Sequence, residues 1–110
     1  MTLDDLRAYG ANVDEGLGRC MGKEELYLHL VSTVKEEPGF DRLFDAVREN
    51  RLEDAFSAAH GLKGVLGNLS ITPLYVPMCE LTELLRHGTQ TNYAPLMDEI
   101  RRERERFIAL

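Results

Sequence analysis

The apolar residues of this chain recur at the spacing of α-helices. Between residues 52 and 69 they follow one another at intervals of three or four for about five turns, at Leu52, Ala55, Ala59, Leu62, Leu66 and Leu69. The alternating patterns of β-strands and the Asn-Gly turns of hairpins are missing. The sequence therefore predicts an all-α protein in which the helix over 52–69 turns one face to a core.

Two shorter apolar stretches precede this helix. Residues 24–35 carry a stripe of Leu26, Leu30, Val31 and Val34, and residues 40–47 carry a stripe of Phe40, Leu43, Phe44 and Val47. Pro38-Gly39 lies between them, and a proline removes a backbone donor and disfavours helix at the residue before it. We expect either one helix kinked here or two helices that meet here, followed by a tight reversal at Asn50-Arg51.

Two more helices follow the longest one. Thr72-Pro73 has the residue types of an N-cap and a first helical position, Gly88 is expected to end that helix, and Pro77 is expected to distort its start. Asn92 is the expected N-cap of the last helix. The predicted inward residues are Leu74, Met78, Leu81, Leu85, Leu96, Met97, Ile100 and Phe107, and the predicted solvated ones are Arg101, Arg102, Arg104 and Arg106.

The first 22 residues are less regular, because four glycines interrupt them. A short helix capped by Thr2 and one or two turns over 14–20 are expected there, as a strap over one end of the core. Short connections make consecutive helices neighbours of opposite direction. The sequence thus predicts a single domain over 1–110, with a strap over 1–22 and an antiparallel four-helix bundle over about 23–110.

Composition narrows the classes of function. The 110 residues include 13 basic and 19 acidic ones, a net charge of −6, which argues against binding to nucleic acid. A chain of this length buries roughly two-thirds of its unfolded surface, which leaves little room for a deep cleft. No stretch approaches the roughly 18 apolar residues of a membrane span, and the first residues do not resemble a leader. We expect a cytoplasmic monomer that binds neither nucleic acid nor membrane.

The two cysteines give no sign of a metal site. Cys20 and Cys79 lie far apart, without a second cysteine or a histidine at metal-ligand spacing. We expect both to be buried thiols and expect no bound metal. His29 and His87 are expected at the surface, the latter at the negative end of its helix.

The helix over 52–69 contains an unexpected number of glycines. Gly61, Gly64 and Gly67 each cost about 0.8–1 kcal/mol relative to Ala in a helix interior, and none lies in the apolar stripe. Packing within the chain therefore does not explain them. At about 100° per residue, His60 lies one step round from Ala59 on the outward face, so the glycines leave a bare patch around an exposed imidazole.

This arrangement suits a histidine that accepts a phosphoryl group. An imidazole is largely neutral at pH 7, and its free nitrogen needs no separate base to act as a nucleophile. Lys63, three residues further on, would stabilise an anion at the ring, and Gly64 would leave space for a tetrahedral group. The expected docking surface for a partner adds the outward residues Ser57, Gly61, Gly67 and Asn68.

The same residues resemble a known signature. Residues 59–64 read AHGLKG and residues 68–69 read NL, which is similar to the AHxLKG…NL signature of the histidine-containing phosphotransfer (HPt) domains of two-component phosphorelays. Residues 13–27 resemble the approach to the first long helix of these domains, and residues 71–81 resemble the helix after the signature. The likeness covers 13–88. It departs from the family pattern at Ser70, where many members have Gly, and at Pro77.

The resemblance implies a four-helix bundle in which His60 receives a phosphoryl group from the phospho-aspartate of one receiver domain and passes it to another. It makes Lys63 the electrostatic support and Gly64 the residue that provides clearance. The implied partners are response-regulator receiver domains or a hybrid sensor histidine kinase. The chain has no Gly-rich ATP loop and no Asp/Asn cluster for magnesium, so we expect a carrier rather than an enzyme, without a cofactor of its own. Mg²⁺ would be held by the partner receiver.

Two other hypotheses remain open. The chain could be a helical docking module that binds a receiver or kinase domain without accepting phosphate, and such a module would carry no acid-labile modification. A histidine-based hydrolase or metal enzyme would need a second ligand or base beside His60, and the sequence places neither His29 nor His87 there.

Overall fold

The computed structural model describes residues 1–110 as seven α-helices without a strand. They are α1 (Leu3–Tyr9), α2 (Val13–Arg19), α3 (Glu24–Val34), α4 (Gly39–Arg48), α5 (Leu52–Asn68), α6 (Thr72–Arg86) and α7 (Ala94–Ile108). The prediction of an all-α protein is confirmed. None of these helices has both the length and the apolar composition needed to cross a membrane.

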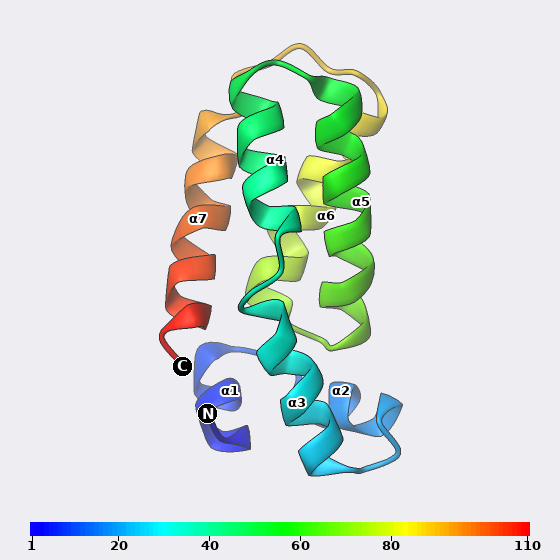
Figure 1. Ribbon diagram of the computed structural model, residues 1–110, viewed down its shortest axis with the longest axis vertical. Helices are drawn as coiled ribbons and strands as arrows, with labels where there is room; N and C mark the ends of the chain where they lie inside the picture. Colours follow the sequence, from blue (N-terminus) through cyan, green and yellow to red (C-terminus); the bar gives the residue numbers. More distant parts are fainter.

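The helices form an elongated bundle of 41 × 23 × 19 Å. In Figure 1, α4, α5, α6 and α7 lie along the long axis, whereas α1, α2 and α3 gather at the end where the C-terminus lies. Helix α5 packs against both α4 and α6, and α6 also packs against α7. The chain between Val34 and Gly39 separates α3 from α4, so the predicted break near Pro38 takes the form of two helices.

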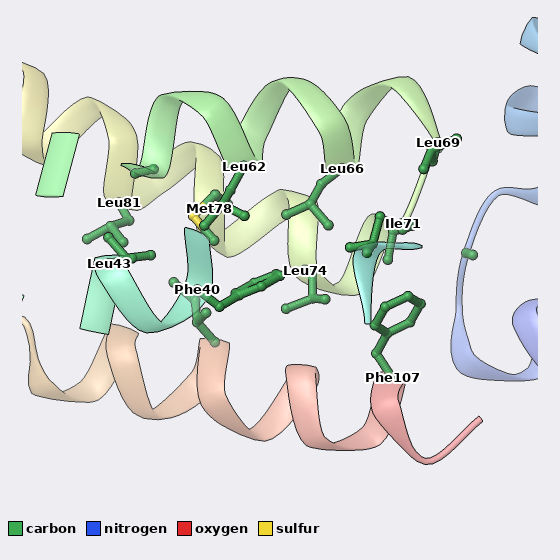
Figure 2. Packing of buried hydrophobic residues seen from close by; sticks show 14 of the residues in the cluster. Phe40, Leu43, Leu62, Leu66, Leu69, Ile71, Leu74, Met78, Leu81 and Phe107 are labelled. Atoms are coloured by element: carbon green, nitrogen blue, oxygen red, sulfur yellow. The ribbon is translucent and has the colours of Figure 1, made fainter. Parts of the chain in front are cut away.

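The core is a single cluster of 25 buried apolar residues that all seven helices or their caps contribute to. Figure 2 shows its centre, where Leu62 and Leu66 of α5 face Met78 and Leu74 of α6, and where Leu69 lies near Ile71 at the end of α5. The predicted stripe of α5 is buried except for Leu52, which is half-buried. Its burial fixes the rotation of α5 and therefore decides which residues of this helix face solvent.

The stripe predicted for α3 is confirmed at Val31 and Val34, which are buried, and at Leu30, which is half-buried, but it is wrong at Leu26. Leu26 is 39% exposed, whereas Tyr27 beside it is fully buried. The Tyr27 hydroxyl donates to the carbonyl oxygen of Leu69 at 2.9 Å, so the polar end of this side chain has a partner inside the core. Tyr27 therefore reaches the C-cap residue of α5, whereas the neighbouring Leu26 stays at the surface.

Several predicted helix ends are shifted by one residue. The N-cap of α6 is Ile71, so that Thr72 and Pro73 occupy the first two helical positions. The N-cap of α7 is Tyr93, although Asn92 still accepts from the N–H of Ala94 through its side chain at 3.1 Å. Helix α6 runs without interruption through Pro77 to Arg86. Thr2 caps α1 as predicted, in a reciprocal capping box with Asp5.

Two predictions about single side chains are wrong. Arg104 is not solvated: its side chain is 20% exposed, and its guanidinium carbon lies 4.9 Å from the centre of the Phe40 ring. A long side chain of this kind can cover apolar surface while its charged end reaches water. Cys79 is half-buried rather than buried, whereas Cys20 is buried as expected.

Candidate functional site

Helix α5 turns His60 to solvent in the middle of its length. Ala59 and Leu62, on either side in sequence, are buried, and His60 is exposed as predicted. Gly64 is two residues from both Leu62 and Leu66, which is about 200° round the helix, so burial of the leucines places Gly64 at the centre of the outward face. Lys63 lies three residues after His60, on the side toward α6, and is half-buried.

The predicted docking residues divide between two grooves. His60, Lys63, Gly64, Gly67 and Asn68 line an open groove together with residues of α2, its N-cap and α6, among them Glu15, Arg19, Tyr75 and Val76. Ser57 and Gly61 line a different groove on the other side of α5, against α4. The structure thus brings five of the seven predicted residues into one groove and leaves two outside it.

The three glycines of α5 differ in their surroundings. A Cβ atom at Gly61 or Gly64 would meet no atom within 4 Å, whereas one at Gly67 would lie 2.7 Å from Cε1 of Tyr75. The expectation that internal packing does not require these glycines is therefore wrong for Gly67. Its missing side chain lets the Tyr75 ring of α6 lie against the α5 backbone. Gly64 has no such neighbour, and the space beside it opens to solvent.

The end of α5 next to this groove is held by the N-terminal strap. Arg19 donates to the carbonyl oxygens of Gly67 at 3.0 Å and Asn68 at 3.2 Å, and to Oγ of Ser70 at 2.7 Å. These carbonyls belong to the last turn of α5, where backbone acceptors lack helical partners. The backbone of Ser70 has φ of +55°, and the N–H of Ile71 donates to Leu66 at 3.0 Å, as in a helix end that favours Gly.

Glu15 completes this contact. It accepts from Arg19 at 2.7 Å and from Ser70 at 3.0 Å, and these hydrogen bonds lower the pKa of its carboxyl group. The hydroxyl of Ser70 therefore joins α2 to the end of α5. Gly16 allows the close approach, since a Cβ there would lie 2.7 Å from the carbonyl oxygen of Leu69.

The charge available to a ligand in the groove comes from Lys63. Arg19 and Glu15 form an ion pair with each other at 2.7 Å. Lys63 takes part in none of the ion pairs of the molecule. Its ammonium group is thus the unpaired cation beside His60. No three side chains of His, Cys, Asp or Glu gather at a distance suited to a common metal ion.

An aromatic side chain that the sequence analysis missed lies against the histidine. The rings of Phe56 and His60 are stacked, with their centres 5.7 Å apart and their planes at 26°. Arg86 of α6 covers Phe56, with its guanidinium carbon 5.1 Å from the centre of the ring. The spacing of four residues between Phe56 and His60 was a usable signal for this pair. No signal in the sequence indicated the contacts that Arg19 and Tyr75 make with Gly67, because these contacts join different helices.

The other two histidines lie away from the groove. His29 is exposed on α3, and His87 is exposed at the C-cap of α6, with Nε2 3.8 Å from Glu83. Comparisons of the chain with protein-family models, with curated proteins and with solved structures found no match.

Proposed function

We propose that this protein is a histidine phosphotransfer protein of a two-component phosphorelay. His60 would accept a phosphoryl group from the phospho-aspartate of one receiver domain and pass it to a second. The observation that carries the proposal is the exposure of His60 in the middle of α5, at an open groove, with the open space of Gly64 on one side and the unpaired cation of Lys63 on the other. A receiver active site could close over such a ring without a cleft in this chain.

The chemistry needs little from the carrier. The lone pair of one ring nitrogen attacks phosphorus as the bond between phosphorus and the aspartate oxygen breaks. The aspartate leaves as a carboxylate, and the ring becomes a phospho-imidazolium whose other nitrogen keeps its proton. No base on this chain is required, and reversal of the same steps returns the phosphoryl group to an aspartate. Lys63 would offset the negative charge of the phosphoryl oxygens.

Helices α4 to α7 would form the antiparallel four-helix bundle of such carriers, with the strap and α3 across one end. Mg²⁺ and the phospho-aspartate would belong to the receiver, which would act on this chain in the cytoplasm. The groove of His60 would be the centre of the docking surface, and Ser57 and Gly61 would lie at its border because they face α4.

A transfer assay tests the proposal. Receiver domains from the same organism are loaded with acetyl phosphate, freed of it and mixed with this protein. The modified residue is mapped by mass spectrometry under conditions that preserve phosphohistidine. We expect a single acid-labile phosphoryl group on His60, absent in His60→Gln and retained in His29→Gln and His87→Gln. Binding of a receiver without modification would favour the docking module instead.

A second pair of variants tests the role of the open space. Gly64→Gln fills the space beside His60, and we expect it to slow transfer without unfolding α5. Gly61→Gln is the matched control, because Gly61 is equally free of neighbours but faces the other groove. We expect a smaller effect there. An unchanged rate in Gly64→Gln would show that Gly64 does not provide clearance for the partner.

A further inference from the structure

The side chain of His60 stacks on Phe56, a ring that packs against the core. Phe56 is half-buried and packs against the core, whereas His60 is exposed. Their centre distance of 5.7 Å and interplanar angle of 26° correspond to an offset stack, one of the favoured arrangements of aromatic pairs. One face of the imidazole is thus covered by a ring that the fold holds in place.

Phe56 is itself held from a second helix. The guanidinium of Arg86 lies over its ring, and Nε of Arg86 donates to Glu83 at 3.2 Å. Arg86 of α6 therefore contacts Phe56, and Phe56 in turn contacts His60. None of the side-chain hydrogen bonds of the molecule involves the His60 ring, and its aromatic partner is Phe56.

We propose that Phe56 is a positioning residue that orients the imidazole of His60 for phosphoryl transfer. The attacking lone pair lies in the plane of the imidazole, so the edge of the ring must point at phosphorus in line with the bond that breaks. If the ring rotated freely, its face instead of its edge would point at the phosphorus atom for part of the time, and no lone pair would then be available for attack. Stacking on Phe56 favours ring orientations in which an edge, with its nitrogen, points outward. This inference rests on the proposed function of His60.

The test compares variants that keep or remove the aromatic ring. Phe56→Leu retains apolar volume without a ring, and Phe56→Tyr retains the ring. Phe56→Met serves as a second apolar variant if Phe56→Leu does not give the circular dichroism of the folded protein. Two quantities are measured: the NMR shifts of the His60 ring protons, and the rate at which a phosphorylated receiver domain, which holds its phosphoryl group in a fixed position when docked, labels His60. His29 and His87 are internal references for both.

We expect Phe56→Leu to move the His60 ring protons downfield, through loss of the aromatic ring current, and to slow labelling of His60 about two- to tenfold. Phe56→Tyr should stay close to the wild type in both measurements. Unchanged ring shifts or an unchanged rate in Phe56→Leu would overturn the inference, as would an equal loss in Phe56→Tyr. If wild-type His60 is not labelled more readily than His29 and His87, the proposed function fails, and the ring shifts alone then decide whether Phe56 orients the ring.

Discussion

Gly64 and Gly67 stand three residues apart on α5, yet the surroundings of the two residues are opposite. Beside Gly64 there is only solvent, whereas Gly67 lies under the ring of Tyr75. The same difference separates two regions of the helix. In its middle, next to His60, a Cβ atom at Gly61 or Gly64 would meet no atom within 4 Å. Its end, at Gly67 to Ser70, is bound by Arg19 from the strap.

This comparison shows that a glycine in a helix can permit a close contact within the chain, as Gly67 does, or stand where the fold leaves open space, as Gly64 does. Gly67 permits a close contact within the chain, so its lower helix propensity is offset by packing. Gly64 has no packing gain to offset its loss of about 1 kcal/mol relative to Ala.

The largest effect on stability is expected from Gly67→Ala. The new Cβ would lie 2.7 Å from Cε1 of Tyr75, and overpacking of this kind costs about 1–3 kcal/mol, partly offset by a propensity gain of about 1 kcal/mol. We expect a net loss of up to about 2 kcal/mol in urea unfolding. The control is the same change in a Tyr75→Leu background, where the clash is removed. An equal loss in both backgrounds would show that Tyr75 is not the cause.

The next effect concerns the anchored end of α5. Arg19→Gln removes hydrogen bonds to the last carbonyls of the helix, and we expect a loss of about 1 kcal/mol together with faster amide hydrogen exchange near Leu69. Arg7→Gln is the matched control, because Arg7 pairs only with the exposed Asp4 and Asp14. Surface ion pairs contribute little, so Arg7→Gln should change stability by less than about 0.5 kcal/mol. Equal effects would contradict the anchoring role of Arg19.

A substitution in the exposed middle of α5 should raise the stability of the protein instead of lowering it. Gly64→Ala adds a methyl group where no atom lies within 4 Å, so helix propensity alone acts. We expect a stabilisation of up to about 1 kcal/mol, measured by thermal and urea unfolding. A loss of stability would mean that Gly64, like Gly67, is required by the fold, and the contrast between the two glycines would be wrong.

The smallest expected effect is on the pH dependence of stability. Hydrogen bonds from Arg19 and Ser70 lower the pKa of Glu15 from its ordinary value of 4.5. A carboxyl group with a lowered folded pKa stabilises the protein above its unfolded pKa, and this contribution is lost as pH falls through the folded pKa. Acid should therefore weaken the anchored end of α5 below about pH 4.5. Glu15→Gln should reduce the slope of stability against pH in this range, whereas Glu25→Gln, at an exposed glutamate without an ion pair, should not.

The sequence predicted those features that depend on neighbours along one helix. The buried stripe from Ala55 to Leu69 and the exposure of His60 both follow from the period of the helix, and the structure has both. In α3, apolar residues lie on adjacent positions, so periodicity alone did not decide between Leu26 and Tyr27. The hydroxyl of Tyr27 has an acceptor in the carbonyl oxygen of Leu69, 42 residues away, and this contact accounts for the burial of Tyr27 rather than Leu26.

The features that the sequence did not predict depend on contacts between different helices. Arg19 and Gly67 are 48 residues apart, and Gly67 packs under Tyr75 of the next helix. No local pattern distinguishes Gly67 from Gly64, because both lie outside the apolar stripe of α5. The division of the predicted docking residues into two grooves has the same origin, since it depends on where α4 and α6 lie beside α5.

The most direct test of the proposed function compares three exposed histidines within one chain. The protein is mixed with a phosphorylated receiver domain, and the phosphoryl group is mapped among His29, His60 and His87. The account predicts modification of His60 alone, complete loss in His60→Gln with the fold intact, and return of the phosphoryl group to a second receiver. Modification that survives His60→Gln, or that is spread evenly over the three histidines, would contradict it.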